Sequence, residues 1–220
     1  MKKFLALIMC FTMIFVFSAC GDSDVRGEVD GKKSDTVTQE EKEYSFGLIQ
    51  GAKYENEFIG IGCEFDESWT FYTEEQIKQL NNISADLMGE ELAESIKNAT
   101  IIYDMMASNT NGSNVNINLE KVGLIQNAAI DIKTRLENTL PSIKEGLTNM
   151  GLTNITSEIT TVTFVGKKTD AIKITGDING VKLYETVMCI KTNQYITSIA
   201  VTSVNTDETG NIISKFYKVG

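Results

Sequence analysis

The last third of the chain contains four strand-like segments joined by turns of two or three residues. Each segment alternates polar and apolar side chains or is rich in β-branched residues; they cover residues 155–165, 170–178, 181–190 and 195–204. The turns fall at Gly166-Lys167-Lys168, Asn179-Gly180 and Thr192-Asn193. Because such short connections cannot carry the chain back across a sheet, neighbouring segments must pair antiparallel. The fold is therefore expected to be built on an antiparallel sheet.

Further strand signals lie in the first half of the chain. Residues 48–54 and 58–65 are expected to be strands on either side of a turn at 55–57, and residues 100–107 and 115–121 are expected to form a second pair. The loop between the last two contains an Asn-Gly pair, which supplies positive φ at low cost and favours a hairpin. One face of the second strand is apolar: Ile59, Ile61, Cys63 and Phe65.

Helix signals separate these strands. Thr73-Glu74-Glu75-Gln76 is a capping-box pattern that predicts the start of one helix. Ser84 precedes apolar residues at helical spacing and predicts a second helix that ends near Asn98. A third helix is predicted between Ile125 and Met150, where apolar residues recur every three or four positions.

Two signals bear on how the helices end. Gly151 is expected to terminate the third helix, and Pro141 inside it is expected to kink it or split it in two. A closing helix is predicted over residues 212–217, where the apolar residues Ile212, Ile213, Phe216 and Tyr217 have helical spacing.

Up to eight strands in sequential hairpins, with helices after the second and fourth, predict an α+β fold with a mostly antiparallel sheet flanked by helices. The pattern Tyr54-x-Asn56-x-Phe58-x-Gly60, followed by Phe65 and Trp69, a hairpin over residues 184–203 and a terminal helix, resembles the PsbP-like α-β-α sandwich domains. More closely, it resembles uncharacterised lipoproteins of gut Gram-positive anaerobes. The resemblance covers residues 47–216 and implies a non-catalytic accessory or binding role, with no functional residue carried over.

The N-terminus has the pattern of an export signal. Lys2 and Lys3 precede an apolar run from Phe4 to Phe17 whose one polar residue is Thr12. This run is short, since a membrane-spanning helix needs roughly 20 apolar residues.

The residues Phe17-Ser18-Ala19-Cys20 that end the run resemble a bacterial lipobox, which implies cleavage before Cys20 and attachment of lipid to its sulfur. A plain secretory signal and an uncleaved anchor are the alternatives.

The predicted organisation has three parts: a signal peptide at residues 1–19, a tether at 20–43 and a single globular domain at 44–220. The tether has few large apolar residues and many charged, Gly and Ser residues, so it cannot bury enough surface to offset its ordering entropy. The formal charge of the chain is −10. Nucleic acid is therefore not expected as a partner, and the domain is expected to stand off anionic lipid headgroups.

The chain has four cysteines and no histidine. Cys10 would leave with the signal and Cys20 would carry lipid, so Cys63 and Cys189 remain as two buried thiols or, alternatively, a disulfide. Without histidine a zinc site and a histidine-based triad are excluded, and no metal or other cofactor is expected. The carboxylate pairs Asp66-Glu67, Glu74-Glu75 and Glu90-Glu91 are expected to be solvated, because adjacent residues on a helix do not face each other.

Three further motifs are candidate sites. Gly60-Ile61-Gly62 lies in a predicted strand and lacks a third glycine, so it is expected to permit a bulge or close packing. Residues 205–210 are similar to the first half of a calcium loop, but Phe216 occupies the position of the bidentate Glu, so calcium is not expected. Aromatic residues beside the second strand are expected to pack at the edge of the core or to line a ligand groove: Trp69, Phe71 and Tyr72.

The sequence thus predicts a lipid-anchored, extracytoplasmic accessory or binding protein of the bacterial cell envelope that is not an enzyme. Its predicted partners are the membrane, through lipid on Cys20, and an envelope protein, a glycan or a small ligand. Two alternatives are an envelope hydrolase or transferase that uses carboxylates or Cys63, and a small-molecule binding subunit of a transporter.

Overall fold

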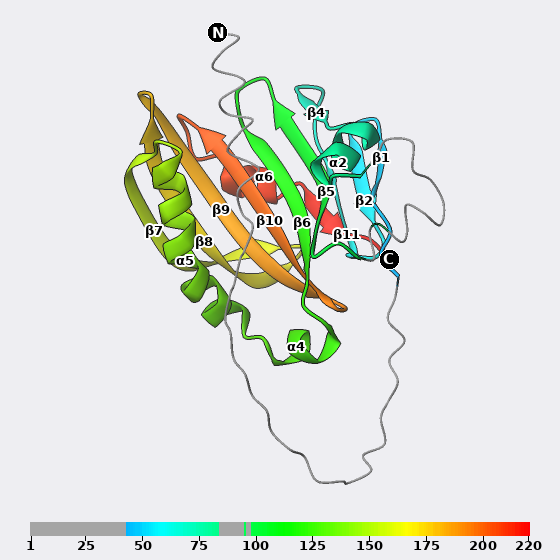
Figure 1. The fold of residues 1–220 in the computed structure, drawn as a ribbon. Coiled ribbons are helices and arrows are strands. Elements are labelled where there is room, and N and C mark those ends of the chain that lie inside the picture. The colour runs from blue at the N-terminus through cyan, green and yellow to red at the C-terminus, as the bar shows by residue number, and fades with distance from the viewer. Residues whose placement is uncertain (1–42, 84–94, 96–97) are drawn as a thin grey trace, which may run out of the picture.

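Two antiparallel sheets form the scaffold of the protein (Figure 1). The computed structural model describes residues 43–83, 95 and 98–220. The four-stranded sheet has the order β1 (Leu48–Gln50), β2 (Lys53–Asn56), β3 (Ile61–Glu64) and β11 (Phe216–Lys218). The seven-stranded sheet has the order β4 (Trp69–Phe71), β5 (Ile101–Asn109), β6 (Asn114–Lys121), β10 (Tyr195–Val204), β9 (Val181–Thr192), β8 (Lys167–Ile178) and β7 (Thr153–Phe164).

The helices of the described residues are α2 (Glu74–Leu80), α4 (Leu124–Ala129), α5 (Ile132–Asn149) and α6 (Thr209–Ile213). The expectation of a mostly antiparallel α+β fold is confirmed at this level. The signal peptide and Cys20 lie outside the described residues, as does the tether apart from Glu43. Of the helix predicted from Ser84 to Asn98, only Ser95 and Asn98 are described, and both are helical. In the part of the chain that the structure describes, no helix has the length and apolar character needed to cross a membrane.

The hairpins of the last third are confirmed. β7, β8, β9 and β10 follow one another as antiparallel neighbours, and β10 then pairs with β6. Between β8 and β9, Asn179 and Gly180 have φ of 50° and 79°, the left-handed values that a tight two-residue hairpin turn needs. The predicted hairpin of β5 and β6 also forms.

The structure corrects the prediction for residues 48–65. The single strand expected over residues 48–54 is a hairpin of β1 and β2, which turns at Gly51-Ala52, where Gly51 has a φ of 61°. β2 continues to Asn56, so the turn expected at 55–57 falls after that residue. The predicted apolar face is nevertheless buried. The alternation of polar and apolar residues does not reveal this turn, because a two-residue loop hardly interrupts the alternating pattern.

The long predicted helix is divided at a different place from the one expected. α4 ends at Ala129, Ile130 is extended, and Asp131 caps α5 by accepting a 2.8 Å hydrogen bond from the backbone N–H of Thr134. α5 runs through Pro141. The capping side chain therefore sets the division, and the proline does not. The predicted end of the helix at Gly151 is confirmed by its φ of 92°.

The closing helix is shorter than predicted. α6 ends at Ile213, and Phe216 and Tyr217 belong to β11, where Phe216 lies opposite Cys63 of β3. Phe216 packs against Phe65 and Phe164 with ring centroids 6.3 Å and 5.3 Å apart. Contacts with the two sheets thus override the helical spacing of these residues.

Two apolar cores lie on opposite faces of the seven-stranded sheet. On one face, the four-stranded sheet and α6 contribute residues such as Tyr54, Ile61 and Ile212. On the other face, α5 packs Leu136, Ile143 and Leu147 onto β7, β8 and β9 (Figure 1). The described layers are therefore α5, the large sheet, and a second sheet with α6. The α-β-α sandwich expected from the PsbP-like resemblance is not confirmed.

Candidate binding groove

A groove of about 700 Å³ lies between the edge strands of the two sheets. One wall is the segment from Phe46 to Gly51, which contains β1, and the other is β4 with the residues that lead into α2. Asp104 and Lys78 also line it. We call this feature the aromatic groove. Trp69, Phe71 and Tyr72, which the sequence singled out as candidate groove residues, all line it.

The aromatic side chains of β4 serve both the core and the groove. The ring of Trp69 stacks on Phe65 at a centroid distance of 4.3 Å and an interplanar angle of 19°, and Phe71 lies 5.7 Å from the same ring. Phe65 is buried, whereas Trp69 and Phe71 are half-buried. These side chains therefore pack at the edge of the core and also line the wall of the groove. Trp69 is the single tryptophan of the chain.

The backbone of β1 is arranged by the turn that follows it. Gln50 and Lys53 close the two-residue hairpin, so the next pair, Ile49 and Tyr54, is of the kind that exchanges no backbone hydrogen bonds. The N–H and C=O of Ile49 consequently point away from β2. The N–H of Gly47, two residues earlier, points to the same side and donates to Oδ1 of Asp104 at 3.0 Å.

Asp104 is a buried carboxylate that organises one end of the groove. Its side chain is 2% exposed and accepts from the hydroxyls of Tyr44 and Tyr54, from Gly47 N and from Asn56 Nδ2 at 3.1 Å. The register of β5 shifts between Tyr103 and Met105, which makes Asp104 the extra residue of a β-bulge. A bulge turns a side chain out of the regular alternation, and here it turns Asp104 toward the first sheet.

Burial and hydrogen bonding have opposite effects on the pKa of Asp104. Burial raises the pKa of its carboxyl above the usual range, and the four donors oppose this rise. Burial and the negative charge of Asp104 raise the pKa of both Tyr44 and Tyr54 well above 10. Both tyrosines therefore remain hydroxyl donors to Asp104 at neutral pH. The network fixes the segment that contains Tyr44 and Gly47 against the sheet.

An aromatic cluster holds the same segment from the other side. The ring of Tyr44 packs edge-on against Phe46 and Phe58, each at 5.4 Å, and Phe58 packs against Tyr195 at 5.7 Å. Such edge-to-face pairs contribute about 0.5–1.5 kcal/mol each beyond their burial. The segment from Tyr44 to Gly47 is therefore ordered and lies beside the aromatic groove.

The helix at the groove begins as the sequence predicted. Thr73 caps α2 by accepting from Gln76 N at 3.3 Å, and Gln76 Oε1 accepts from Thr73 N at 2.8 Å, which is the expected capping box. One turn later Lys78 is buried and forms a 2.9 Å ion pair with Glu74. Glu74 is 79% exposed, so the cation is covered while its partner faces water.

The two remaining cysteines are buried free thiols in different cores, so the structure does not form the alternative disulfide. Burial raises the pKa of the Cys63 thiol far above its usual range and that of Cys189 to about 11. Both effects oppose thiolate chemistry, because the thiolate is the reactive form. Cys63 is therefore a core residue of β3, in surroundings that disfavour the thiolate.

The paired carboxylates do not form a site among the described residues. Asp66 and Glu67 are exposed, and Oδ1 of Asp66 accepts from Ser68 N at 2.9 Å. Glu74 and Glu75 are exposed at the start of α2, while Glu90 and Glu91 lie outside the described residues. No group of three or more His, Cys, Asp or Glu side chains suitable for a metal occurs in the part that the structure describes.

The two other motifs have structural explanations. A Cβ on Gly62 would lie 2.8 Å from the carbonyl oxygen of Tyr54 and 2.8 Å from the ring of Tyr217, so the predicted role in close packing is confirmed. In the calcium-like segment, Oδ1 of Asp207 accepts from Thr209 N at 3.1 Å and from the Thr209 hydroxyl at 2.6 Å. That carboxylate oxygen helps to start α6.

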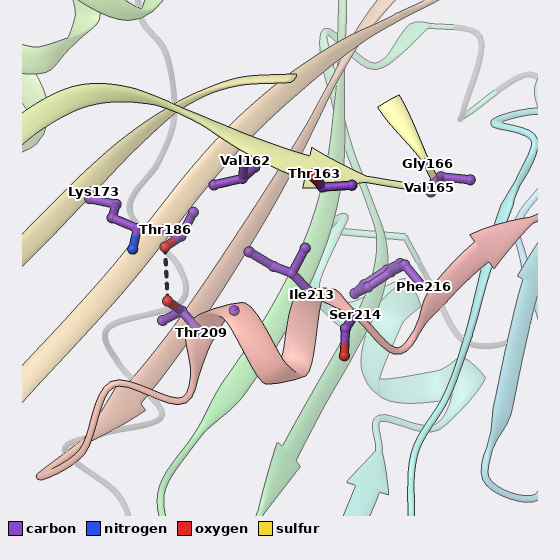
Figure 2. A pocket seen from close by; sticks show the side chains of 11 residues that line it. Val162, Thr163, Val165, Gly166, Lys173, Thr186, Thr209, Ile213, Ser214 and Phe216 are labelled. Carbon is purple, nitrogen blue, oxygen red and sulfur yellow. Dashed lines mark hydrogen bonds between the residues drawn. The ribbon is translucent and has the colours of Figure 1, made fainter. Parts of the chain in front are cut away.

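Another cavity, of about 490 Å³, lies between α6 and the strands β7, β8 and β9 (Figure 2). Its wall includes Val162, Ile213 and Phe216. Thr186 donates to the hydroxyl of Thr209 at 3.0 Å, as Figure 2 shows, and Lys173 lies 3.9 Å from Asp207. These polar side chains bond to one another, so the aromatic groove is the better candidate for a ligand.

Sequence reasoning missed the network around Asp104. Tyr54 and Asn56 were noted for their spacing, but nothing linked them to a carboxylate 48 to 50 positions later. A usable signal was present, because Asp104 is the one charged residue in the apolar strand from Ile101 to Ala107. A lone carboxylate in such a run must find donors in the fold.

Comparisons with known proteins give no family. No family model and no curated protein matches the chain in sequence. Among solved structures, one from Bacteroides thetaiotaomicron has a TM-score of 0.43 and 10% identity, over 78% of this chain and 50% of that one. LpqN of Mycobacterium tuberculosis, described as involved in cell envelope biogenesis, has a TM-score of 0.39 and 9% identity, over 73% of this chain and 83% of that one.

The chain thus spans half the length of the Bacteroides protein. Both TM-scores are below 0.5, so neither similarity identifies a function.

Proposed function

We propose that the protein is a lipid-anchored, extracytoplasmic and non-catalytic binding protein of the bacterial cell envelope, and that the aromatic groove is its binding site. The observation that carries the proposal is the groove itself: a concave, largely apolar site with aromatic walls and two fixed charged groups, Asp104 and Lys78. Sites of this volume and composition are typical of ligand binding.

The anchoring part of the proposal is supported by the residues that precede the described fold. Phe17-Ser18-Ala19-Cys20 has the lipobox pattern, and two acyl chains on Cys20 would hold the protein on a membrane because each buried methylene contributes about 0.8 kcal/mol. Residues 20–43 would then act as a flexible connection with a root-mean-square reach of roughly 25–30 Å. This connection joins the fold at Tyr44, next to the groove.

A binding role is favoured over catalysis by how the polar groups of the groove are used. Asp104 is held by four donors, and Lys78 is paired with Glu74, so both side chains are fixed in place. The thiol alternative is opposed by the complete burial of Cys63. The PsbP-like relationship belongs to this proposal as well, supported by the spacing of Tyr54, Asn56 and Phe58.

The test is a binding screen on the full-length protein in lipid nanodiscs. Peptides, glycans and metabolites are added, and thermal unfolding is followed by Trp69 fluorescence, since a ligand of the native state raises the melting temperature. Leu48, which is 60% exposed at the groove, and Ile125, which is 83% exposed on α4, provide matched variants. A ligand shift that Leu48→Ser abolishes and Ile125→Ser retains supports the proposal. Ligand shifts that both variants retain contradict it.

A further inference from the structure

In the part of the chain that the structure describes, no strand pairs with the outer edge of β1. Within the described residues β1 pairs with β2 alone, and the N–H and C=O of Ile49 face the other side. The N–H of Gly47, two residues before Ile49, faces the same side and already donates a hydrogen bond to Asp104. The carboxylate thus occupies the place that a carbonyl of an adjacent strand would take, and the next outward-facing groups belong to Ile49.

The aromatic groove lies along this edge. Ile49 and Leu48 are part of one wall, and Trp69 and Phe71 form the opposite wall. Leu48 is a large apolar side chain that remains 60% exposed beside the groove. An unpaired strand edge next to apolar side-chain pockets is the arrangement used for adding an extended peptide to a sheet, where main-chain bonds give affinity and pockets give specificity.

The connecting segment of the same chain is a poor occupant. Glu43, the first described residue, precedes the groove residue Phe46 by three positions in the sequence. Yet the predicted tether at 20–43 contains no aromatic residue and only three large apolar ones, Val25, Val29 and Val37. Its Asp, Glu, Gly and Ser residues offer little to apolar pockets. The tether is therefore not the occupant that this groove fits.

The charge around the groove favours a particular charge at the two ends of the bound segment. Glu74 lines the groove with its side chain 79% exposed, and Glu75 beside it in the sequence is also exposed. The cation of Lys78 is buried against Glu74, and the chain as a whole has a formal charge of −10. A segment with Lys or Arg at its ends complements this rim, and an acidic segment is repelled.

We infer that the aromatic groove binds an extended segment of another envelope protein, apolar at its centre and basic at its ends, which pairs with β1 through the N–H and C=O of Ile49. This inference rests on the proposed function and specifies its ligand. The pairing would extend the four-stranded sheet by one strand.

The probe is an eight-residue peptide of alternating valine and threonine between terminal lysines, titrated into the full-length protein in nanodiscs and read by Trp69 fluorescence. Two modified peptides carry N-methyl groups on all valines or on all threonines. Because successive N–H groups of a strand point to opposite edges, only one of these peptides blocks pairing with β1. That peptide is expected to bind about tenfold more weakly, the effect of losing one or two hydrogen bonds.

Retained binding by one methylated peptide and loss by the other supports the inference. Equal binding by both, or loss by both, overturns it. Leu48→Ser is expected to weaken binding and Ile125→Ser to leave it unchanged. If the peptides fail while a small molecule or glycan binds in a Leu48-dependent manner, the inference fails and the proposed function stands. If no compound binds in that manner, both fail.

Discussion

The backbone N–H of Gly47 donates a 3.0 Å hydrogen bond to Oδ1 of Asp104, a residue that lies 57 positions later in the chain. This bond joins the entry segment of the fold to the bulge of β5. We predict that Asp104→Asn lowers the free energy of unfolding by about 2–4 kcal/mol, because an amide places a donor among buried donors and leaves some of them unsatisfied. Urea unfolding measures the loss, and hydrogen exchange at Gly47 is expected to accelerate.

Asp66→Asn is the matched control, because Asp66 is exposed. It is expected to change the free energy of unfolding by less than about 1 kcal/mol. Equal stability of the Asp104→Asn variant and the wild type would show that the network does not hold the segment.

The fold is predicted to lose stability as pH rises toward 8. Glu185 is 5% exposed, and burial raises the pKa of its carboxyl to about 8, with an opposing effect from the hydroxyl of Thr202. Between the ordinary pKa of 4.5 and about 8, the folded state keeps a proton that the unfolded state releases, so unfolding becomes easier with rising pH. Since each pKa unit corresponds to about 1.4 kcal/mol, the loss is on the order of several kcal/mol.

The measurement is the midpoint of urea unfolding at pH 5 and pH 9 for the wild type and for Glu185→Gln. In Glu185→Gln the urea midpoints at pH 5 and pH 9 are expected to differ much less than they do in the wild type. Glu158→Gln, on the exposed side of β7, retains Glu185 and is expected to show the wild-type difference. An unchanged difference in Glu185→Gln would assign the pH dependence to other groups.

Both core cysteines are predicted to resist alkylation in the native protein. Cys63 and Cys189 are 0% and 2% exposed, and burial raises the pKa of both thiols. Peptide mass spectrometry after iodoacetamide treatment at pH 8 is expected to find both unmodified in buffer and both modified in guanidinium. Rapid native alkylation of Cys63 would revive the alternative of a thiol-dependent enzyme.

Gly62→Ala is predicted to destabilise the four-stranded sheet. The added methyl group would lie 2.8 Å from the Tyr54 carbonyl oxygen, a backbone atom that cannot move without disturbing β2. The expected cost is about 1–3 kcal/mol, measured by urea unfolding. Gly210→Ala is the control, because a Cβ there meets open space in α6, and it is expected to be neutral or stabilising by up to about 1 kcal/mol. Equal effects of the two substitutions would contradict the argument.

The parts of the fold that sequence predicted well are those set by local chemistry. The hairpins from β7 to β10 follow from short turns such as Asn179-Gly180, and the start of α2 follows from the capping box of Thr73. In each case a few neighbouring residues determine the backbone conformation, so the local sequence is enough to predict the turn or the helix start.

The parts that it missed depend on distant contacts. Phe216 and Tyr217 have helical spacing, but they form β11 because β3 lies beside them. The division between α4 and α5 was also missed, although its cause is local: the cap at Asp131 sets it, and Pro141 does not.

The sequence indicated only some of the residues that form the aromatic groove. The sequence offered Trp69, Phe71 and Tyr72 as groove residues only as an alternative to packing at the core edge, whereas Asp104 reaches the groove through a bulge that no periodicity reveals.

The central claim is that lipid on Cys20 holds the groove at the envelope, and metabolic labelling tests it most directly. Cells that express the wild type or Cys20→Ala are grown with a palmitate analogue, and the protein is recovered from membrane and soluble fractions. The account predicts labelled wild-type protein in the membrane fraction and no label on Cys20→Ala. Unlabelled wild-type protein that is released as a soluble chain with a free thiol at Cys20 would contradict it.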